Sequence, residues 1–164
     1  MASILKPPMP LDLDGRRPAV FLAGSIEMGR VRNWQRRVER ALQDLDAVIL
    51  NPRRDDWDSS WRQTVKNRQF REQVEWELEA QERATLIAMY FAPRTKAPIT
   101  LLELGLAARS GKAVVCCPAG FWRKGNVDVV CRRYSIPTVP SLNKLIQYVR
   151  QALPGRRQTM LASK

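Results

Sequence analysis

One carboxylate stands inside a largely apolar stretch of the sequence, APITLLELGLAARSGK, which spans residues 97–112. This residue is Glu103, and Pro98 suits the first position of a helix, so Glu103 is expected early in a helix. Gly105 removes a side chain two residues later and permits close approach of another group to that helix. Because glutamate is rarely buried without a partner, Glu103 is a candidate for acid–base or nucleophilic chemistry.

A second glutamate, Glu77, has a comparable position in a helix expected over about residues 67–83. At about 100° per residue, Glu77 falls near the centre of the apolar face of that helix, turned toward the sheet. The residues expected on the same face are Phe70, Val74, Leu78 and Gln81. An acid that pairs with a core arginine, or extends to solvent, is the alternative interpretation of Glu77.

Two carboxylates that face one water-poor crevice would raise each other's pKa and separate into an ionised and a protonated member. Such a pair suits a displacement at a glycosidic carbon. One acid then delivers a proton or holds the sugar, and the other attacks the anomeric carbon.

The composition restricts other kinds of chemistry. The 164 residues include no histidine, which excludes Ser/His/Asp and Cys/His triads and histidine-based metal sites. Acid–base chemistry therefore falls to carboxylates, tyrosine, lysine or cysteine, and we expect no metal and no cofactor. Three cysteines, of which Cys116 and Cys117 are adjacent in an apolar segment, indicate buried thiols in a reduced, cytoplasmic protein.

The net charge of +12 makes nucleic acid a conceivable partner, because clustered lysine and arginine attract phosphate. The basic residues are nevertheless scattered, and only residues 30–40 concentrate them, where helical periodicity explains the pattern. We therefore favour a solvated basic surface, and a basic nucleic-acid-binding protein stays open as an alternative. No window approaches the 18 or so apolar residues that span a bilayer, so no membrane partner is expected.

Short strand-like runs alternate with helical patterns from Pro18 onward. The runs that predict strands cover residues 19–24, 47–50, 85–91, 113–117 and 136–139. Near-continuously apolar strands that alternate with helices indicate a doubly wound α/β domain, flavodoxin-like or Rossmann-like. We expect a parallel five-stranded sheet with helices on both faces. Residues 1–18 are expected to be a flexible leader, residues 19–153 the domain, and residues 154–164 a basic tail.

Ligands of such sheets bind outside the carboxyl ends of the strands, where the segments leaving the strands converge. Gly24 and Ser25 end the first predicted strand, where backbone N–H groups could bind a sugar hydroxyl or a phosphate. A plain tight turn explains them equally well. Asp56 and Trp57 follow the second strand, with Trp61 close by. A tryptophan ring there would stack on a nucleobase or pack the loop down as a hydrophobic lid.

Four motifs in order, VFLAGSIEMG, NPRR with a following tryptophan, PITLLELG and GFWRKGNVD, resemble the nucleoside 2-deoxyribosyltransferase-like family, particularly its fungal and bacterial branch. The similarity covers roughly residues 19–150. It implies an enzyme that cleaves the bond between a base and a (deoxy)ribose by double displacement. Glu103, the glutamate of ELG, matches the nucleophile that forms a covalent glycosyl-enzyme. Glu77 matches in spacing an acidic residue that helps to move the proton of the base.

The resemblance also implies roles for other residues and for a second subunit. Asn126 of GNVD resembles an asparagine that reaches across a subunit interface to the neighbour's nucleophile, so a homo-oligomer with shared active sites is implied. Asp128 of the same motif is expected among the substrate-binding residues, as is Phe21, which stands where a supporting tyrosine is common. Ala97 stands where Asp or Ser often binds the sugar.

Three alternatives stay open at this point. A carboxylate in the first loop, Glu27, would repel a phosphate, so a nucleoside without phosphate is the expected small-molecule ligand. Phe21 and Ala97 leave room for a non-catalytic nucleoside- or nucleotide-binding module with the same fold. Transfer to a second base and hydrolysis by water are both compatible with the sequence, because the choice depends on how well the closed pocket excludes water.

Overall fold

The computed structural model of the 164-residue chain describes residues 1–26 and 32–153. Two of the expectations lie outside the described residues, namely the basic tail over 154–164 and the Glu27-Met28-Gly29 part of the first loop. Within the described ranges, no helix is both long enough and apolar enough to cross a membrane.

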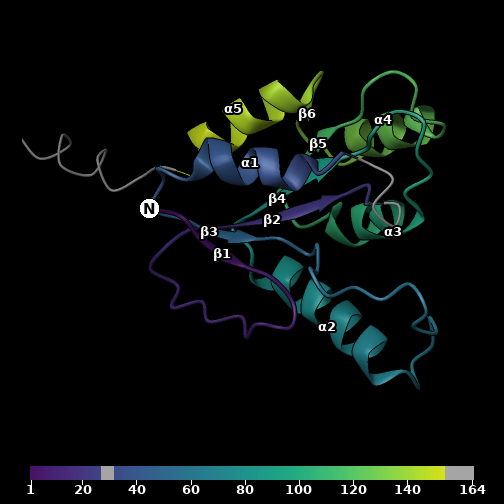
Figure 1. Ribbon diagram of the computed structural model, residues 1–164. Coiled ribbons are helices and arrows are strands. Elements are labelled where there is room, and N and C mark those ends of the chain that lie inside the picture. The colour runs from purple at the N-terminus through teal and green to yellow at the C-terminus, as the bar shows by residue number, and fades with distance from the viewer. Residues whose placement is uncertain (27–31, 154–164) are drawn as a thin grey trace, which may run out of the picture.

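A parallel sheet of six strands, in the order β1-β3-β2-β4-β5-β6, forms the centre of the fold (Figure 1). The strands are β1 (Ser3–Leu5), β2 (Ala19–Gly24), β3 (Val48–Leu50), β4 (Leu86–Tyr90), β5 (Ala113–Cys116) and β6 (Thr138–Val139). Strands β3 and β5 are buried along their whole length, and β2 and β4 are buried at all but their last residue. Such strands are typical of a sheet covered on both faces, and the predicted doubly wound α/β fold is confirmed.

Helices cover the two faces of the sheet. They are α1 (Trp34–Leu42), α2 (Arg68–Arg83), α3 (Pro98–Ala107), α4 (Lys124–Arg133) and α5 (Leu142–Ala152). Figure 1 shows α1 and α5 on one side of the sheet and α2 and α3 on the other. Side chains from α1 and α5 belong to one hydrophobic cluster, and those from α2, α3 and α4 belong to a second cluster on the opposite face.

The predicted number of strands is corrected from five to six. The additional strand, β1, lies within the segment that we expected to be a flexible leader, and it pairs in parallel with β3. The same segment also contacts α2, because Trp76 donates its indole N–H to the carbonyl oxygen of Met9 at 2.8 Å. A three-residue strand beside a proline-rich stretch is too short to show a period of its own, which is why the sequence pattern missed it.

The prediction of which face α2 buries is wrong. Val74 and Leu78 are 36% and 40% exposed. The residues that α2 buries are Gln73, Trp76, Ala80 and Gln81. Polar glutamines can replace aliphatic side chains here because carboxylates accept hydrogen bonds from their amide groups.

The strand order reverses at β2, since β3 lies on one side of it and β4 on the other. In doubly wound sheets, the loops leaving the two strands at such a point diverge, and ligands bind between them. Helix α3, which carries Glu103, follows β4, one of these two strands. The fold therefore places Glu103 on the expected ligand edge.

Gly24 ends β2 where no side chain fits. A Cβ atom at this position would lie 2.5 Å from the carbonyl oxygen of Tyr90 and 2.6 Å from the Trp34 ring. That carbonyl also accepts a hydrogen bond from the backbone N–H of Ser25 at 3.1 Å, so the backbone cannot yield easily. We expect Gly24→Ala to lower the free energy of unfolding by roughly 2–3 kcal/mol, measured by urea denaturation.

Gly105→Ala is the matched control for this prediction. A Cβ atom there meets nothing within 4 Å, and removal of a helical glycine should leave stability unchanged or raise it slightly. A Gly24→Ala protein as stable as the Gly105→Ala protein would contradict the prediction.

Candidate active site

Glu103 lies in the second turn of α3 and is only 7% exposed. Its Oε1 atom accepts a hydrogen bond of 3.2 Å from Nε2 of Gln81, which is itself buried on α2. The helix begins at Pro98, as the sequence predicted. None of the ion pairs within the described ranges involves Glu103 or Glu77, so the alternative of a core arginine partner is not found there.

Glu77 is held on α2 by a second glutamine. Nε2 of Gln73 donates to Oε1 of Glu77 at 2.7 Å and to the carbonyl oxygen of Pro52 at 2.9 Å. The amide of Gln81 donates to the backbone carbonyl of Glu77 at 3.3 Å as well as to Glu103. Residues spaced by four along a helix lie on one face, so Gln73, Glu77 and Gln81 form a polar row along α2, which reaches α3 through Gln81. Each carboxyl group of the pair thus has its own primary amide donor.

Burial raises the pKa of both carboxyl groups. The pKa of Glu77 rises to about 7, because loss of water disfavours the charged form more than the Gln73 hydrogen bond favours it. The pKa of Glu103 rises to about 8, first through burial and then through the negative charge of Glu77. The two groups therefore interact electrostatically, and between pH 7 and pH 8 the pair carries about one proton.

The raised pKa values predict that stability falls as the pH rises. Each carboxyl has a reference pKa of 4.5, so the folded state binds more protons than the unfolded state from about pH 5 to pH 8. The free energy of unfolding therefore decreases across this window, at about 1.4 kcal/mol for each unit of pKa difference. We expect a loss on the order of 6 kcal/mol between pH 5 and pH 8, measured by urea denaturation at each pH.

A double variant, Glu77→Gln with Glu103→Gln, tests the origin of this loss. The chain has no histidine, and burial raises the pKa of the cysteine thiols to about 11 or 12, outside the window. The double variant should therefore have a much flatter profile. An equally steep profile in the variant would show that other groups cause the pH dependence.

A family model described as nucleoside 2-deoxyribosyltransferase like matches residues 17–121, a range that includes both glutamates and both glutamines. The chain belongs to this family. A crystal structure of a conserved protein from Enterococcus faecalis V583 is similar in fold, with a TM-score of 0.60 and 15% sequence identity. The similarity covers 84% of this chain and 99% of that chain. No curated protein matches the sequence.

Ser25, at the end of β2, uses its hydroxyl within the protein. The hydroxyl accepts a hydrogen bond of 3.1 Å from the backbone N–H of Ala92 and lies 2.8 Å from Oγ1 of Thr95. Because Thr95 donates its own hydroxyl to the Ala92 carbonyl, Ser25 is the donor to Thr95. With Gly24 required for close packing, these partners support a tight-turn role for the Gly24-Ser25 pair in this member of the nucleoside 2-deoxyribosyltransferase-like family.

Phe21 and Ala97 occupy buried positions beside the site. Phe21 has no exposed surface and belongs to the hydrophobic cluster that α2 and α3 cover. Ala97 precedes α3 in a left-handed conformation, with φ of 43°, and is 5% exposed. Neither residue offers a polar side-chain atom to a substrate, in contrast to the family pattern.

Asp56 and Trp57 belong to a loop organised around Arg54. Asp56 accepts hydrogen bonds from Nε and Nη2 of Arg54 at 2.6 and 3.2 Å, which lowers the pKa of Asp56. Trp57 packs edge-to-face on Trp61, with ring centres 5.2 Å apart. The Arg54 guanidinium in turn lies 4.9 Å from the centre of the Trp61 ring. The sequence pattern predicted no role for Arg54.

Asn126 and Asp128 lie on α4, a helix that the sequence pattern did not predict. Asp128 forms an ion pair of 2.9 Å with Lys124, and both Asn126 and Asp128 are exposed. Within the described part of the chain, no hydrogen bond links either residue to Glu103 or Glu77. The structure therefore brings together the two glutamates and leaves Asn126 and Asp128 of the GNVD motif on the exposed side of α4.

The partners Gln73 and Gln81 were missed as functional residues. Gln81 was placed on the buried face of its helix without a role, and Gln73 was not singled out. Their spacing of four from Glu77 on either side is a signal that the sequence does contain, because it aligns three hydrogen-bonding side chains on one helix face.

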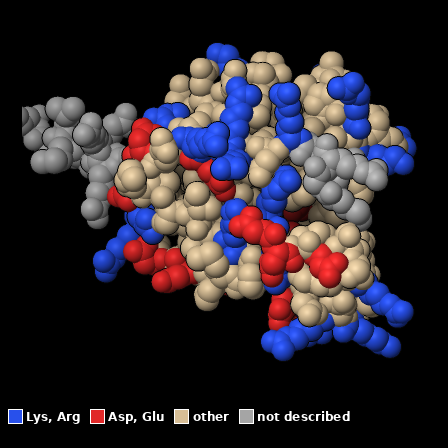
Figure 2. Space-filling view, in the orientation of Figure 1, with Lys and Arg blue, Asp and Glu red and all other residues tan. Residues whose placement is uncertain are grey.

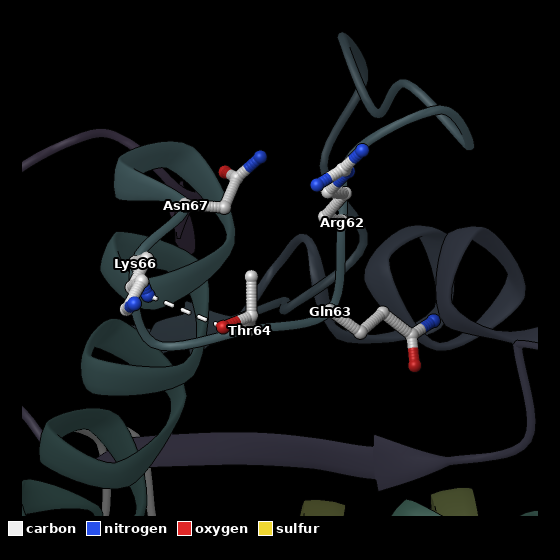
Figure 3. A pocket seen from close by; sticks show the side chains of 5 residues that line it. All are labelled: Arg62, Gln63, Thr64, Lys66 and Asn67. Carbon is white, nitrogen blue, oxygen red and sulfur yellow. Dashed lines mark hydrogen bonds between the residues drawn. The ribbon is translucent and has the colours of Figure 1, made fainter.

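A hollow of about 620 Å³ lies on the segment that leads into α2 (Figure 3). Its lining residues are Arg62, Gln63, Thr64, Lys66 and Asn67. Figure 3 shows their side chains spread around a bend of the chain, with the Thr64 hydroxyl accepting a hydrogen bond of 3.5 Å from the backbone N–H of Lys66. The lining contains two cations and no acid, so it offers no group that could attack or protonate a glycosidic bond.

Proposed function

We propose that the protein cleaves the N-glycosidic bond of a nucleoside, with Glu103 as the nucleophile and Glu77 as the general acid. The observation that carries the proposal is the pair of carboxyl groups on α2 and α3, with Glu103 buried and Glu77 half-buried, each hydrogen-bonded to a glutamine amide. Membership of the nucleoside 2-deoxyribosyltransferase-like family supports the substrate class. A deoxyribonucleoside is therefore the first substrate to test.

In the first step, a carboxylate oxygen of Glu103 attacks C1′ and forms a glycosyl ester. The C1′–N bond breaks, the base leaves with the electron pair, and Glu77 delivers a proton to it. In the second step, a nitrogen of another base or a water oxygen attacks C1′. The ester bond breaks, Glu103 leaves as a carboxylate, and Glu77 accepts the proton of the attacking group. Capture by a base gives deoxyribosyl transfer, and capture by water gives hydrolysis.

This mechanism requires an ionised Glu103 and a protonated Glu77. Burial raises the pKa of both groups, and the negative charge of Glu77 raises that of Glu103 further, so the pair favours a state in which one carboxyl is ionised and the other protonated. Positive charge that develops at C1′ of a bound sugar stabilises the ionised form of Glu103 and leaves the proton on Glu77.

We also propose a homo-oligomer in which Asn126 completes a neighbouring active site. The family resemblance suggests this role, and the exposed position of Asn126 on α4 leaves the side chain available to a second subunit. Light scattering measures the assembly, and a fully active monomer would contradict the proposal.

The charge distribution gives less support to a polynucleotide substrate. Figure 2 shows lysine and arginine spread over the visible face, with aspartate and glutamate among them. Such an arrangement lacks the continuous basic track that follows a phosphate backbone.

The deciding experiment is incubation of the protein with a panel of deoxyribonucleosides, with and without a second base, followed by chromatography. Release of free base in the single-substrate samples supports hydrolysis, and a new nucleoside in the two-base samples supports transfer. Measurable nucleoside binding without any base release would favour the non-catalytic module and overturn the enzyme proposal.

A further inference from the structure

Three buried polar atoms without hydrogen-bond partners belong to the segment that leaves β3 or to a residue bonded to it. They are Nη1 of Arg53, Nη1 of Arg54 and Oε1 of Gln73, whose amide nitrogen donates to the carbonyl oxygen of Pro52. The other side-chain atoms in the described residues that lack partners in this way belong to Gln35 on α1 and to Ser3. A buried polar atom without a partner costs about 1–3 kcal/mol, so native proteins hold few of them. The three atoms of Arg53, Arg54 and Gln73 therefore point to a ligand that supplies the missing partners.

Hydrogen bonds place Gln73 beside both Glu77 and the segment that leaves β3. Gln73 donates its amide to the carbonyl of Pro52, the residue before Arg53, and to Oε1 of Glu77. The unpartnered carbonyl oxygen of Gln73 is thus on the same amide that holds the proposed proton donor.

One guanidinium nitrogen of Arg54 has no hydrogen-bond partner. The Arg54 side chain is only 7% exposed, and Asp56 accepts hydrogen bonds from its Nε and Nη2 atoms. Trp61 lies against the guanidinium, so Nη1 has neither a protein partner nor contact with solvent. Movement of the loop that carries Trp57 and Trp61 would uncover a buried, oriented N–H donor.

We propose that Arg53, Arg54 and Gln73 form a subsite that selects nucleobases with a lactam edge. A lactam edge presents a carbonyl oxygen beside a ring N–H, as in hypoxanthine, guanine, thymine and uracil. A guanidinium N–H donates to the carbonyl oxygen, and Oε1 of Gln73, whose amide nitrogen is already occupied, accepts from the ring N–H. Adenine presents an amino group and an unprotonated nitrogen instead, so it would leave both protein atoms without partners.

This inference rests on the proposed function for its substrate class and adds which bases the site accepts. The base held in this way lies next to Glu77, where the proposed proton transfer requires it. Selection by buried hydrogen-bonding groups can be strong, because the wrong base leaves desolvated atoms unsatisfied.

The experiment compares binding of free hypoxanthine and free adenine by titration calorimetry. We expect hypoxanthine to bind at least about tenfold more tightly than adenine. Arg53→Met and Arg54→Met should each weaken hypoxanthine binding about tenfold and leave adenine binding nearly unchanged. Arg68→Met is the matched control, because Arg68 is exposed and pairs with Glu72. Equal affinity for the two bases, or an equal loss for both bases in both variants, would overturn the inference.

Arg54→Lys provides a second test of Arg54 in case Arg54→Met does not fold. Lysine keeps the charge but lacks the fixed planar donor group, so it should lose the same preference for hypoxanthine. A lysine variant that folds and retains the full preference would exclude Arg54 from the subsite.

Measurement of turnover shows whether the base-selective subsite or the proposed enzymatic function has failed. We expect a higher kcat/KM for 2′-deoxyinosine than for 2′-deoxyadenosine. If neither nucleoside is cleaved but hypoxanthine binds selectively, the enzyme proposal fails and the subsite stands. If both nucleosides are cleaved equally and both bases bind equally, the enzyme proposal stands and the subsite fails.

Discussion

Replacement of Glu103 by glutamine should abolish base release. We expect kcat to fall by at least about a thousandfold, because an amide oxygen cannot form the glycosyl ester. Glutamine has nearly the same size as glutamate, and its carbonyl oxygen can still accept the hydrogen bond that Gln81 donates to Oε1 of Glu103. The fold should therefore persist. Removal of a buried ionisable group should also raise the free energy of unfolding at pH 8.

Two measurements give this prediction its specificity. Rapid acid quench followed by mass spectrometry should detect a deoxyribosyl adduct on the parent protein and none on Glu103→Gln. Glu75→Gln is the control on α2, because Glu75 is exposed and contacts only Arg71 among the ion pairs of the described part. Activity retained in Glu103→Gln, or an adduct at another residue, would refute Glu103 as the nucleophile.

The parts of the fold that the sequence predicted are those with a clear period. The strand predicted over residues 19–24 is β2, and Pro98 begins α3 where expected. Helix α4 was missed because Gly125 and the β-branched Val127, Val129 and Val130 weaken its intrinsic helix preference. Tertiary packing of Val127 and Cys131 against the sheet stabilises it instead.

The site was predicted in its charged residues and missed in its neutral ones. A glutamate on an apolar face contradicts the hydropathy pattern, so Glu77 and Glu103 stand out. Glutamine is neither charged nor apolar, and its role depends on which groups lie opposite in space. The bond from Gln81 to Glu103 therefore became visible only with the packing of α2 against α3, whereas the bond from Gln73 to Glu77 lies within α2, at a spacing of four that the sequence contains. The orientation of α2 depends on the same contacts, which explains why its buried face was also mispredicted.

Replacement of Glu77 by glutamine should slow the reaction according to the leaving group. For 2′-deoxyguanosine, whose base needs a proton to depart, we expect kcat to fall by about 10²–10⁴. For 7-methyl-2′-deoxyguanosine the base already carries a positive charge, so we expect a decrease of less than about tenfold. The comparison keeps the same ring and the same lactam edge, and it therefore isolates proton transfer from recognition of the base.

The pH dependence provides the decisive test of Glu77. Burial raises the pKa of Glu77 to about 7, so in the parent protein the proton needed by the leaving base is lost as the pH rises through this value. The rate for 2′-deoxyguanosine should then decrease on the alkaline side, and Glu77→Gln should remove that decrease because glutamine does not titrate. On the acid side, both proteins should lose activity as Glu103 becomes protonated, since the nucleophile must be ionised. If Glu77→Gln slows both nucleosides equally and keeps the alkaline decrease, Glu77 positions Gln73 and Glu103 without transferring a proton.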